Sequence, residues 1–132
     1  MTTAEDYVSF ETAKSLKEKG FNWECLSYYT RYRSQVTLYD GMIYDWSESY
    51  MNHNVFSDRY SRPTNQMAVK WLREIHNIHI TTELEDPMKI VQPKYNFTVW
   101  ELNKLNSYVV DFYENYKVTC DRAIRFCLLK LI

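Results

Sequence analysis

Two of the three histidines in this chain, His76 and His79, lie three residues apart in the segment KWLREIHNIHI of residues 70–80. Histidines so close in sequence can bind a metal or form a catalytic pair. A zinc site needs three or four converging ligands, and this pair supplies two, with no cysteine or carboxylate at a recognisable spacing. A histidine in the last turn of a helix is also stabilised by the helix dipole. We therefore interpret the segment as a structural joint and predict no metal and no cofactor.

The cysteines do not form a catalytic pattern either. Cys120 and Cys127 are seven residues apart on the apolar side of a predicted helix, where cysteine packs as a small hydrophobe. A reactive thiolate needs an electropositive and partly exposed site. The chain has no G-x-S-x-G, Walker, G-x-G-x-x-G or H-E-x-x-H motif, and its two glycines cannot build the usual phosphate loop. The sequence names no nucleophile or general base, and we predict that the protein is not an enzyme.

Aromatic and arginine side chains are the remaining candidates for a binding site. The chain has 12 Tyr, 6 Phe and 4 Trp, and such residues, with arginine, are common interface anchors. Residues 40–58 are acidic and predict a long irregular loop, which is usually functional or disordered at this length. Its aromatics could instead cover the open face of the sheet. The candidate binding residues are Tyr44, Trp46, Tyr50 and Phe56 in this loop, Arg59 and Arg62 after it, and Arg31, Arg33 and Arg73 elsewhere.

Three kinds of partner fit these residues. Aromatic anchors favour a protein partner, which we rank first. Arginines that converge on a pocket lined by Tyr and Trp would instead bind a small anionic ligand, such as a nucleotide or signalling molecule. Arg31 and Arg33 beside Tyr28, Tyr29 and Tyr32 could stack single-stranded bases. We rank nucleic acid last, because the formal net charge is -1 and neither an RRM signature nor a helix-turn-helix pattern is complete.

The elements that must position these residues begin with a helix. Ser9 is expected to cap it, and Gly20 to end it in a left-handed conformation. Residues 25–33 and 35–41 then predict two strands, joined by a short turn near Ser34.

A second helix is expected after residues 40–58, with Pro63 in its first turn and Ser61 or Thr64 as its cap. Its apolar residues recur at helical spacing and predict one buried stripe, formed by Ala68, Trp71, Leu72 and Ile75.

The hydrophobic period then changes from 3.6 to 2, which predicts a strand over residues 77–85 that follows the helix directly. His79 falls on the less buried side of this strand. Residues 95–102 and 107–114 predict two more strands around a polar turn, and residues 116–131 predict an amphipathic final helix.

Strands that come in adjacent pairs are typical of antiparallel hairpins with helices packed on one face. We predict an α+β fold, a single two-layer domain over residues 1–132, with an antiparallel sheet of four or five strands and about three helices in the order α-β-β-α-β-β(-β)-α. A length of 132 residues with 45% hydrophobic residues suffices for one core. The acidic N-terminus does not resemble a secretory signal, and no apolar run approaches the roughly 20 residues that span a bilayer. We expect a cytoplasmic protein with no membrane partner.

Three segments carry a family resemblance: SFETAKSLKEKGF, RPTNQMAVKWLREIHNIHI and FYENYKVTCDRAIRFCLLKLI. They resemble a group of small uncharacterised proteins of Bacteroides-type bacteria, their phages and integrated mobile elements. The resemblance covers most of the chain. It implies an accessory protein of a phage or mobile element in the host cytoplasm, and it implies no activity. The predicted function is non-covalent interaction with a host or phage protein, and homo-oligomerisation stays open.

Overall fold

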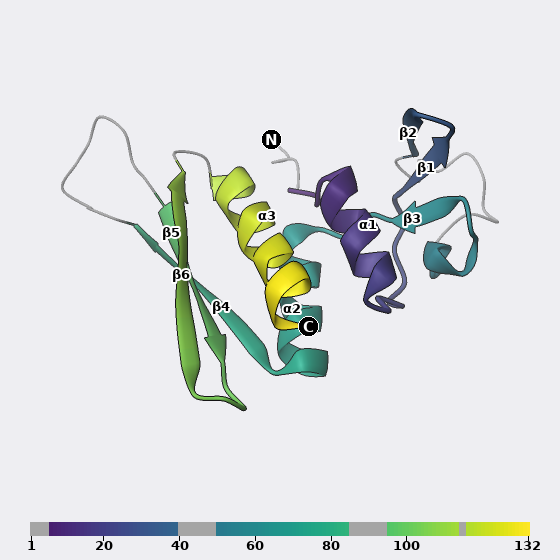
Figure 1. The fold of residues 1–132 in the computed structure, drawn as a ribbon. Helices are drawn as coiled ribbons and strands as arrows, with labels where there is room; N and C mark the ends of the chain where they lie inside the picture. Colours follow the sequence, from purple (N-terminus) through teal and green to yellow (C-terminus); the bar gives the residue numbers. More distant parts are fainter. Residues whose placement is uncertain (1–5, 40–49, 85–94, 114–115) are drawn as a thin grey trace. The chain divides into compact units, whose positions relative to one another are not determined.

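The structure is a computed structural model, and it describes residues 6–39, 50–84, 95–113 and 116–132. Contacts along the chain divide it into two compact units, Met1–Thr64 and Asn65–Ile132. Helices and antiparallel strands occur in both, so the predicted α+β class is confirmed. The described residues form six strands in two three-stranded sheets, whereas we expected four or five strands in one sheet (Figure 1).

Helix α1, Phe10–Glu18, is the only α-helix in the described part of the first unit. The hydroxyl of Ser9 accepts a hydrogen bond from the backbone N–H of Thr12 at 3.3 Å, which confirms the predicted cap. Gly20 has a φ of 88°, and the N–H of Phe21 donates to the carbonyl of Leu16 at 2.9 Å. The helix therefore ends where the sequence predicted, with its last carbonyl groups satisfied.

The first sheet has the strand order β2-β1-β3. Strands β1, Tyr28–Tyr32, and β2, Gln35–Tyr39, form the predicted hairpin, whose two-residue turn has Arg33 at a φ of 57°. Strand β3, Arg59–Ser61, pairs antiparallel with β1 and was not predicted. Three residues are too few for a period of two to be visible in the sequence.

The described part of the predicted irregular loop, from residue 50 onwards, has no strand or α-helix but contains two short ordered features. Met51 and Cys25 exchange two backbone hydrogen bonds, at 2.9 and 3.3 Å. Residues His53–Val55 form a 3₁₀ turn, and the side chain of Asn52 caps it by accepting the N–H of Asn54. The first contact joins residues that are distant in the sequence, and the second lies within a single turn. Neither kind of contact produces a periodic pattern in the sequence.

The second unit is a two-layer arrangement. Strands β4, Ile78–Leu84, β5, Tyr95–Glu101, and β6, Asn106–Tyr113, form an antiparallel sheet in that order. Helices α2, Asn65–His76, and α3, Tyr116–Phe126, lie together on one face of this sheet (Figure 1). Helix α3 continues as a π-helical segment, Cys127–Leu131.

Helix α2 differs from the prediction at both of its ends. Ala68, Trp71 and Leu72 are buried, but Ile75 is 57% exposed. The ring of His76 packs on Trp71 instead, with ring centroids 4.7 Å apart, so the last turn presents Ile75 to solvent. At the other end, the helix begins at residue 65, after the proline that we had placed in its first turn.

Candidate functional site

The structure places two of the predicted binding residues, Phe56 and Arg59, in one stack of rings in the first unit. The guanidinium of Arg59 lies 4.4 Å from the ring centroid of Phe56 and 4.6 Å from that of Tyr28. Tyr28 in turn stacks on Tyr39, with centroids 5.1 Å apart, and on His53 at 4.2 Å. The buried Tyr28 thus contacts the exposed Tyr39 directly and the exposed Phe56 through Arg59. Ring stacking and cation–π contacts stabilise this arrangement.

Lys17 of α1 holds the main chain beneath this stack. Its ammonium group donates to the carbonyl oxygens of Phe56, Ser57 and Arg59 at 2.6, 3.3 and 2.7 Å. It also lies 4.7 Å from the ring centroid of Tyr60. Burial lowers the pKa of this amine, and the nearby carboxylate of Asp58 opposes that shift. Lys17 thus holds residues 56–59 against the helix, a role that no pattern in the sequence indicates.

Arg62 has a structural position. Its guanidinium lies 4.0 Å from the ring centroid of Tyr7 and 5.6 Å from that of Tyr29, and its Nη1 donates to the hydroxyl of Ser27 at 3.1 Å. These contacts tie Arg62 to two other segments of the first unit, one at residue 7 and one at residues 27–29. Arg62 therefore stabilises the first unit, because its planar guanidinium stacks on aromatic rings.

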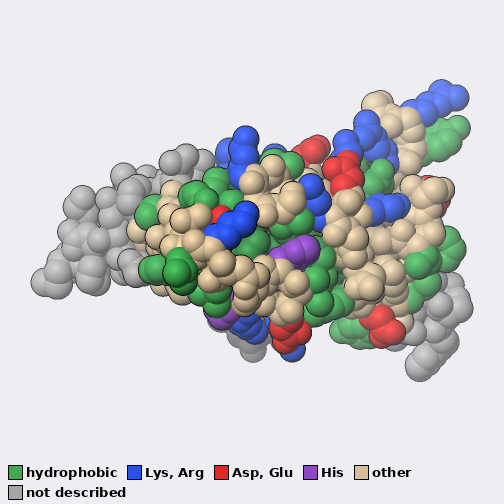
Figure 2. Space-filling view, turned by 60° about the horizontal axis from the view of Figure 1, so that its bottom comes forward, with side chains coloured by type: hydrophobic (Ala, Val, Ile, Leu, Met, Phe, Trp, Pro, Cys, Tyr) green, Lys and Arg blue, Asp and Glu red, His purple; other side chains and the backbone are tan. Residues whose placement is uncertain are grey.

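The other predicted arginines are not brought into this stack. Arg31 and Arg33 are exposed at the β1–β2 turn, where the Nε of Arg31 donates to the carbonyl of Arg33 at 3.2 Å. Arg73 is exposed on α2, in the second unit. In the view of Figure 2, Lys and Arg side chains of the described residues are interspersed with polar and hydrophobic ones.

Two of the four predicted aromatic binding residues can be located in the structure. Tyr44 and Trp46 lie outside the described residues. Tyr50 is 63% exposed and Phe56 is 40% exposed, and Val55 beside Phe56 is 67% exposed. The third histidine, His53, is fully buried, and its backbone N–H donates to the hydroxyl of Ser61 at 3.1 Å. The described part of residues 40–58 thus combines a buried polar anchor with exposed apolar side chains.

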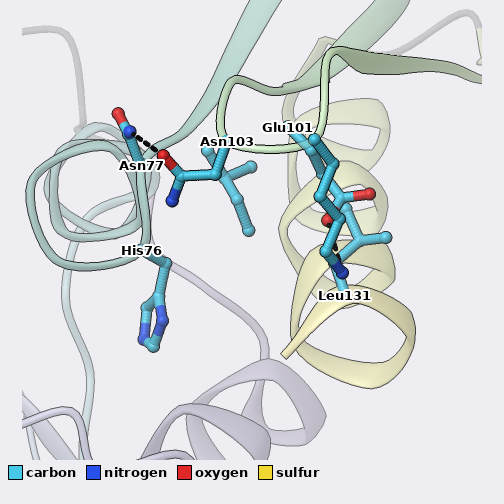
Figure 3. Close-up of a pocket in the computed structure, with 7 residues that line it drawn as sticks. His76, Asn77, Glu101, Asn103 and Leu131 are labelled. Carbon is cyan, nitrogen blue, oxygen red and sulfur yellow. Dashed lines mark hydrogen bonds and ion pairs between the residues drawn. The ribbon is translucent and has the colours of Figure 1, made fainter.

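A small pocket lies in the second unit, where the joint of α2 and β4 meets the β5–β6 turn (Figure 3). Its volume is about 110 Å³. The amide of Asn77 donates to Asn103 at 2.8 Å on one side, and Glu101 and Leu131 lie on the other. Ligand pockets usually enclose roughly 300–1,000 Å³. This pocket is therefore too small for a nucleotide.

Glu101 is the buried carboxylate of this pocket and is 6% exposed. It accepts a hydrogen bond from the hydroxyl of Tyr108 at 2.9 Å, and the ammonium of Lys104 lies 3.4 Å away. The hydrogen bond to Glu101 raises the pKa of Tyr108. These two partners satisfy the carboxylate within the unit, as a buried charge requires. The site can hold a small polar molecule, but its carboxylate is already engaged by structural partners.

The histidine pair does not converge on one point. His76 packs on Trp71, and burial lowers its pKa, so the neutral imidazole is favoured. This corrects our explanation of His76, because the interaction of a histidine with the helix dipole requires the protonated form. His79 lies opposite Trp100 in the β4–β5 register. Among the described residues no three His, Cys, Asp or Glu side chains cluster as metal ligands, and the absence of a metal stays a prediction.

The cysteines occupy core positions, as predicted for Cys120 and Cys127. All three are buried. Burial raises the pKa of Cys25 and of Cys127 to about 12. Their thiols are therefore protonated at neutral pH, and neither has the electropositive, exposed surroundings of a nucleophile.

Comparisons with protein-family models, with curated protein sequences and with solved structures find no match to this chain. No helix in the described part of the chain is long and apolar enough to cross a membrane.

Proposed function

We propose that the chain acts by binding a protein partner non-covalently, and that Tyr50, Val55, Phe56 and Arg59 form the binding surface. The observation that carries the proposal is the exposure of Val55 and Phe56 on a segment whose main chain is held by Lys17. A large apolar group on a fixed backbone loses little conformational entropy when a partner covers it. Aromatic residues and arginine are also the side chains that most often dominate binding energy.

The stack around Arg59 supports the same proposal. Because its guanidinium already lies between Phe56 and Tyr28, both the ring and the charge are held in place before a partner arrives. A partner with an acidic side chain near this position would meet the positive charge of Arg59 while it covers Phe56. The preferred partner is therefore a protein with an apolar patch next to an acidic residue.

Two alternatives are weaker on this geometry. A nucleotide or signalling molecule needs a larger enclosed volume than the pocket of about 110 Å³ beside Asn77. Nucleic acid needs a basic stripe, and Arg59 and Arg62 are stacked on rings within the first unit. The motif resemblance supports the wider context that we propose, an accessory protein of a phage or mobile element in the host cytoplasm.

The experiment compares partner recovery with stability. The tagged protein and its Tyr50→Ala, Val55→Ser and Phe56→Ser variants are incubated with nuclease-treated lysate of a Bacteroides-type bacterium, and the recovered proteins are quantified by mass spectrometry. Tyr32→Ser is the matched control, because Tyr32 is 74% exposed in the same unit but lies at the hairpin end.

We expect one recovered protein to be lost in the Val55 and Phe56 variants and retained in the control, with melting temperatures unchanged. Equal recovery in all variants would refute the surface. A fall of several degrees in the melting temperature, with recovery retained, would show that these side chains only cover the core. The incubation is repeated with untreated lysate, and a protein that is recovered only without nuclease treatment would favour the nucleic-acid alternative.

A further inference from the structure

Strand β2 is the edge of the first sheet. It pairs with β1 on one side, and no other strand pairs with it within the residues that the structure describes. All five of its residues are exposed, including Val36, Leu38 and Tyr39. Natural edge strands are usually protected by charge, proline or a bulge. The sequence QVTLY contains no charged residue and no proline, and its pairing with β1 has a regular register without a bulge.

The hydrogen-bonding groups that face this open edge follow from the hairpin. A two-residue turn makes Tyr32 and Gln35 a hydrogen-bonded pair. Along the two strands, hydrogen-bonded pairs alternate with non-hydrogen-bonded pairs, whose backbone groups point away from each other. Val36 lies opposite Arg31, whose N–H donates to Asp58 on the β3 side at 3.4 Å. The backbone groups of Val36 and, two residues on, of Leu38 therefore point away from β1.

These outward groups are self-complementary. If a second β2 strand runs antiparallel with Thr37 opposite Thr37, each Val36 lies opposite a Leu38 and each outward N–H meets an outward carbonyl. The same register places Gln35 opposite Tyr39. Moving the centre to residue 36 or 38 leaves part of the strand unpaired. The centred register engages all five residues, brings apolar side chains together and places no like charges opposite each other.

We propose that a second copy of this chain docks on the β2 edge, so that two three-stranded sheets join into one six-stranded sheet about a two-fold axis at Thr37. The interface is isologous, as in most symmetric dimers. It uses main-chain hydrogen bonds for affinity and the Val36–Leu38 pairs for register. Because only five residues pair, the dimer forms reversibly and depends on protein concentration.

Disulfide trapping tests the register directly. In a non-hydrogen-bonded antiparallel pair the Cα atoms are about 4.5 Å apart, which is within the range of a disulfide. Thr37→Cys should therefore form a disulfide-linked dimer in a thiol–disulfide buffer. Val36→Cys is the matched control, because two residues of offset place the two cysteines beyond about 7 Å. The native cysteines are buried and contribute little background.

Analytical ultracentrifugation of the native sequence and of Leu38→Pro gives a second, independent test. Leu38→Pro removes an outward N–H that β1 does not use, and proline is tolerated on an edge strand. We expect the association constant to fall at least about tenfold, whereas Leu38→Val, which keeps the N–H, should change it little. Circular dichroism checks that both variants fold.

Selective trapping of Thr37→Cys, together with a dimer that Leu38→Pro weakens, supports the proposal. A native chain that stays monomeric at the highest concentration reached, with no trapping, overturns it. Equal trapping of Val36→Cys and Thr37→Cys, or a dimer that Leu38→Pro leaves intact, also overturns it, because the two chains would then meet elsewhere.

Discussion

Replacing Trp71 by alanine should cost about 3–5 kcal/mol of unfolding free energy. Trp71 lies on α2 and is 2% exposed. A buried aromatic side chain removes about 150–250 Å² from water, and each Å² contributes about 25 cal/mol. The methyl group of alanine retains about 1 kcal/mol of that burial. The edge-on contact with His76, at 4.7 Å between centroids, is lost as well.

Guanidinium denaturation followed by circular dichroism at a helix band measures this loss, since tryptophan fluorescence would itself change with the substitution. Ile75→Ala in the same helix is the matched control, because Ile75 is 57% exposed and should change the free energy by less than about 1 kcal/mol. If Trp71→Ala costs under about 1 kcal/mol with an unchanged denaturant slope, the assignment of the core of α2 is refuted.

Two more positions give stability predictions. Burial holds the pKa of His76 below its usual 6.5, so the unfolded chain binds this proton more readily, and the free energy of unfolding should fall as the pH drops below 6.5 towards the folded-state pKa. Denaturation across this pH range should show a smaller fall in the free energy of unfolding for His76→Gln than for the native chain. If the variant has the same pH profile as the native chain, His76 is not the cause of the fall. Leu105 has a φ of 56° and is 93% exposed in the β5–β6 turn. Leu105→Gly should raise the free energy of unfolding by about 0.5–1 kcal/mol, because relief of left-handed strain exceeds the entropy cost of glycine. A measured loss would show that this turn is not strained.

The sequence predicted the elements whose causes are local. The cap at Ser9, the left-handed Gly20 and the change of period after His76 each depend on neighbours within a few residues, and all three are present. Strand β3 and the buried His53 were missed, because both are held by contacts with β1, which is distant in the sequence. No hydrophobic period records such a contact.

The candidate site was predictable only as a list of residue types. Phe56 and Arg59 were among the candidates and are in contact in the structure, but the lysine that holds their main chain lies about 40 residues earlier, on the first helix. A lysine at that position has the same pattern as any solvated helix residue. Arg62 was chosen for its charge, yet Tyr7 and Tyr29 hold that charge within the fold. The sequence therefore identifies residue types that are suited to a binding surface. Three-dimensional packing decides which of these residues are available to a partner.

The joint between α2 and β4 shows how a short spacing can suggest chemistry that the geometry does not support. His76 ends the helix and packs on Trp71, in the helical layer. Asn77 then takes a φ of 56°, a left-handed conformation that asparagine adopts at little cost, and the strand begins at the next residue. Ile78 is buried, and successive side chains of a strand point to opposite faces, so His79 lies on the face of the sheet away from the helices. The sheet therefore separates the two imidazoles. A shared metal would require His79 to turn inward, which would move Ile78 out of the core.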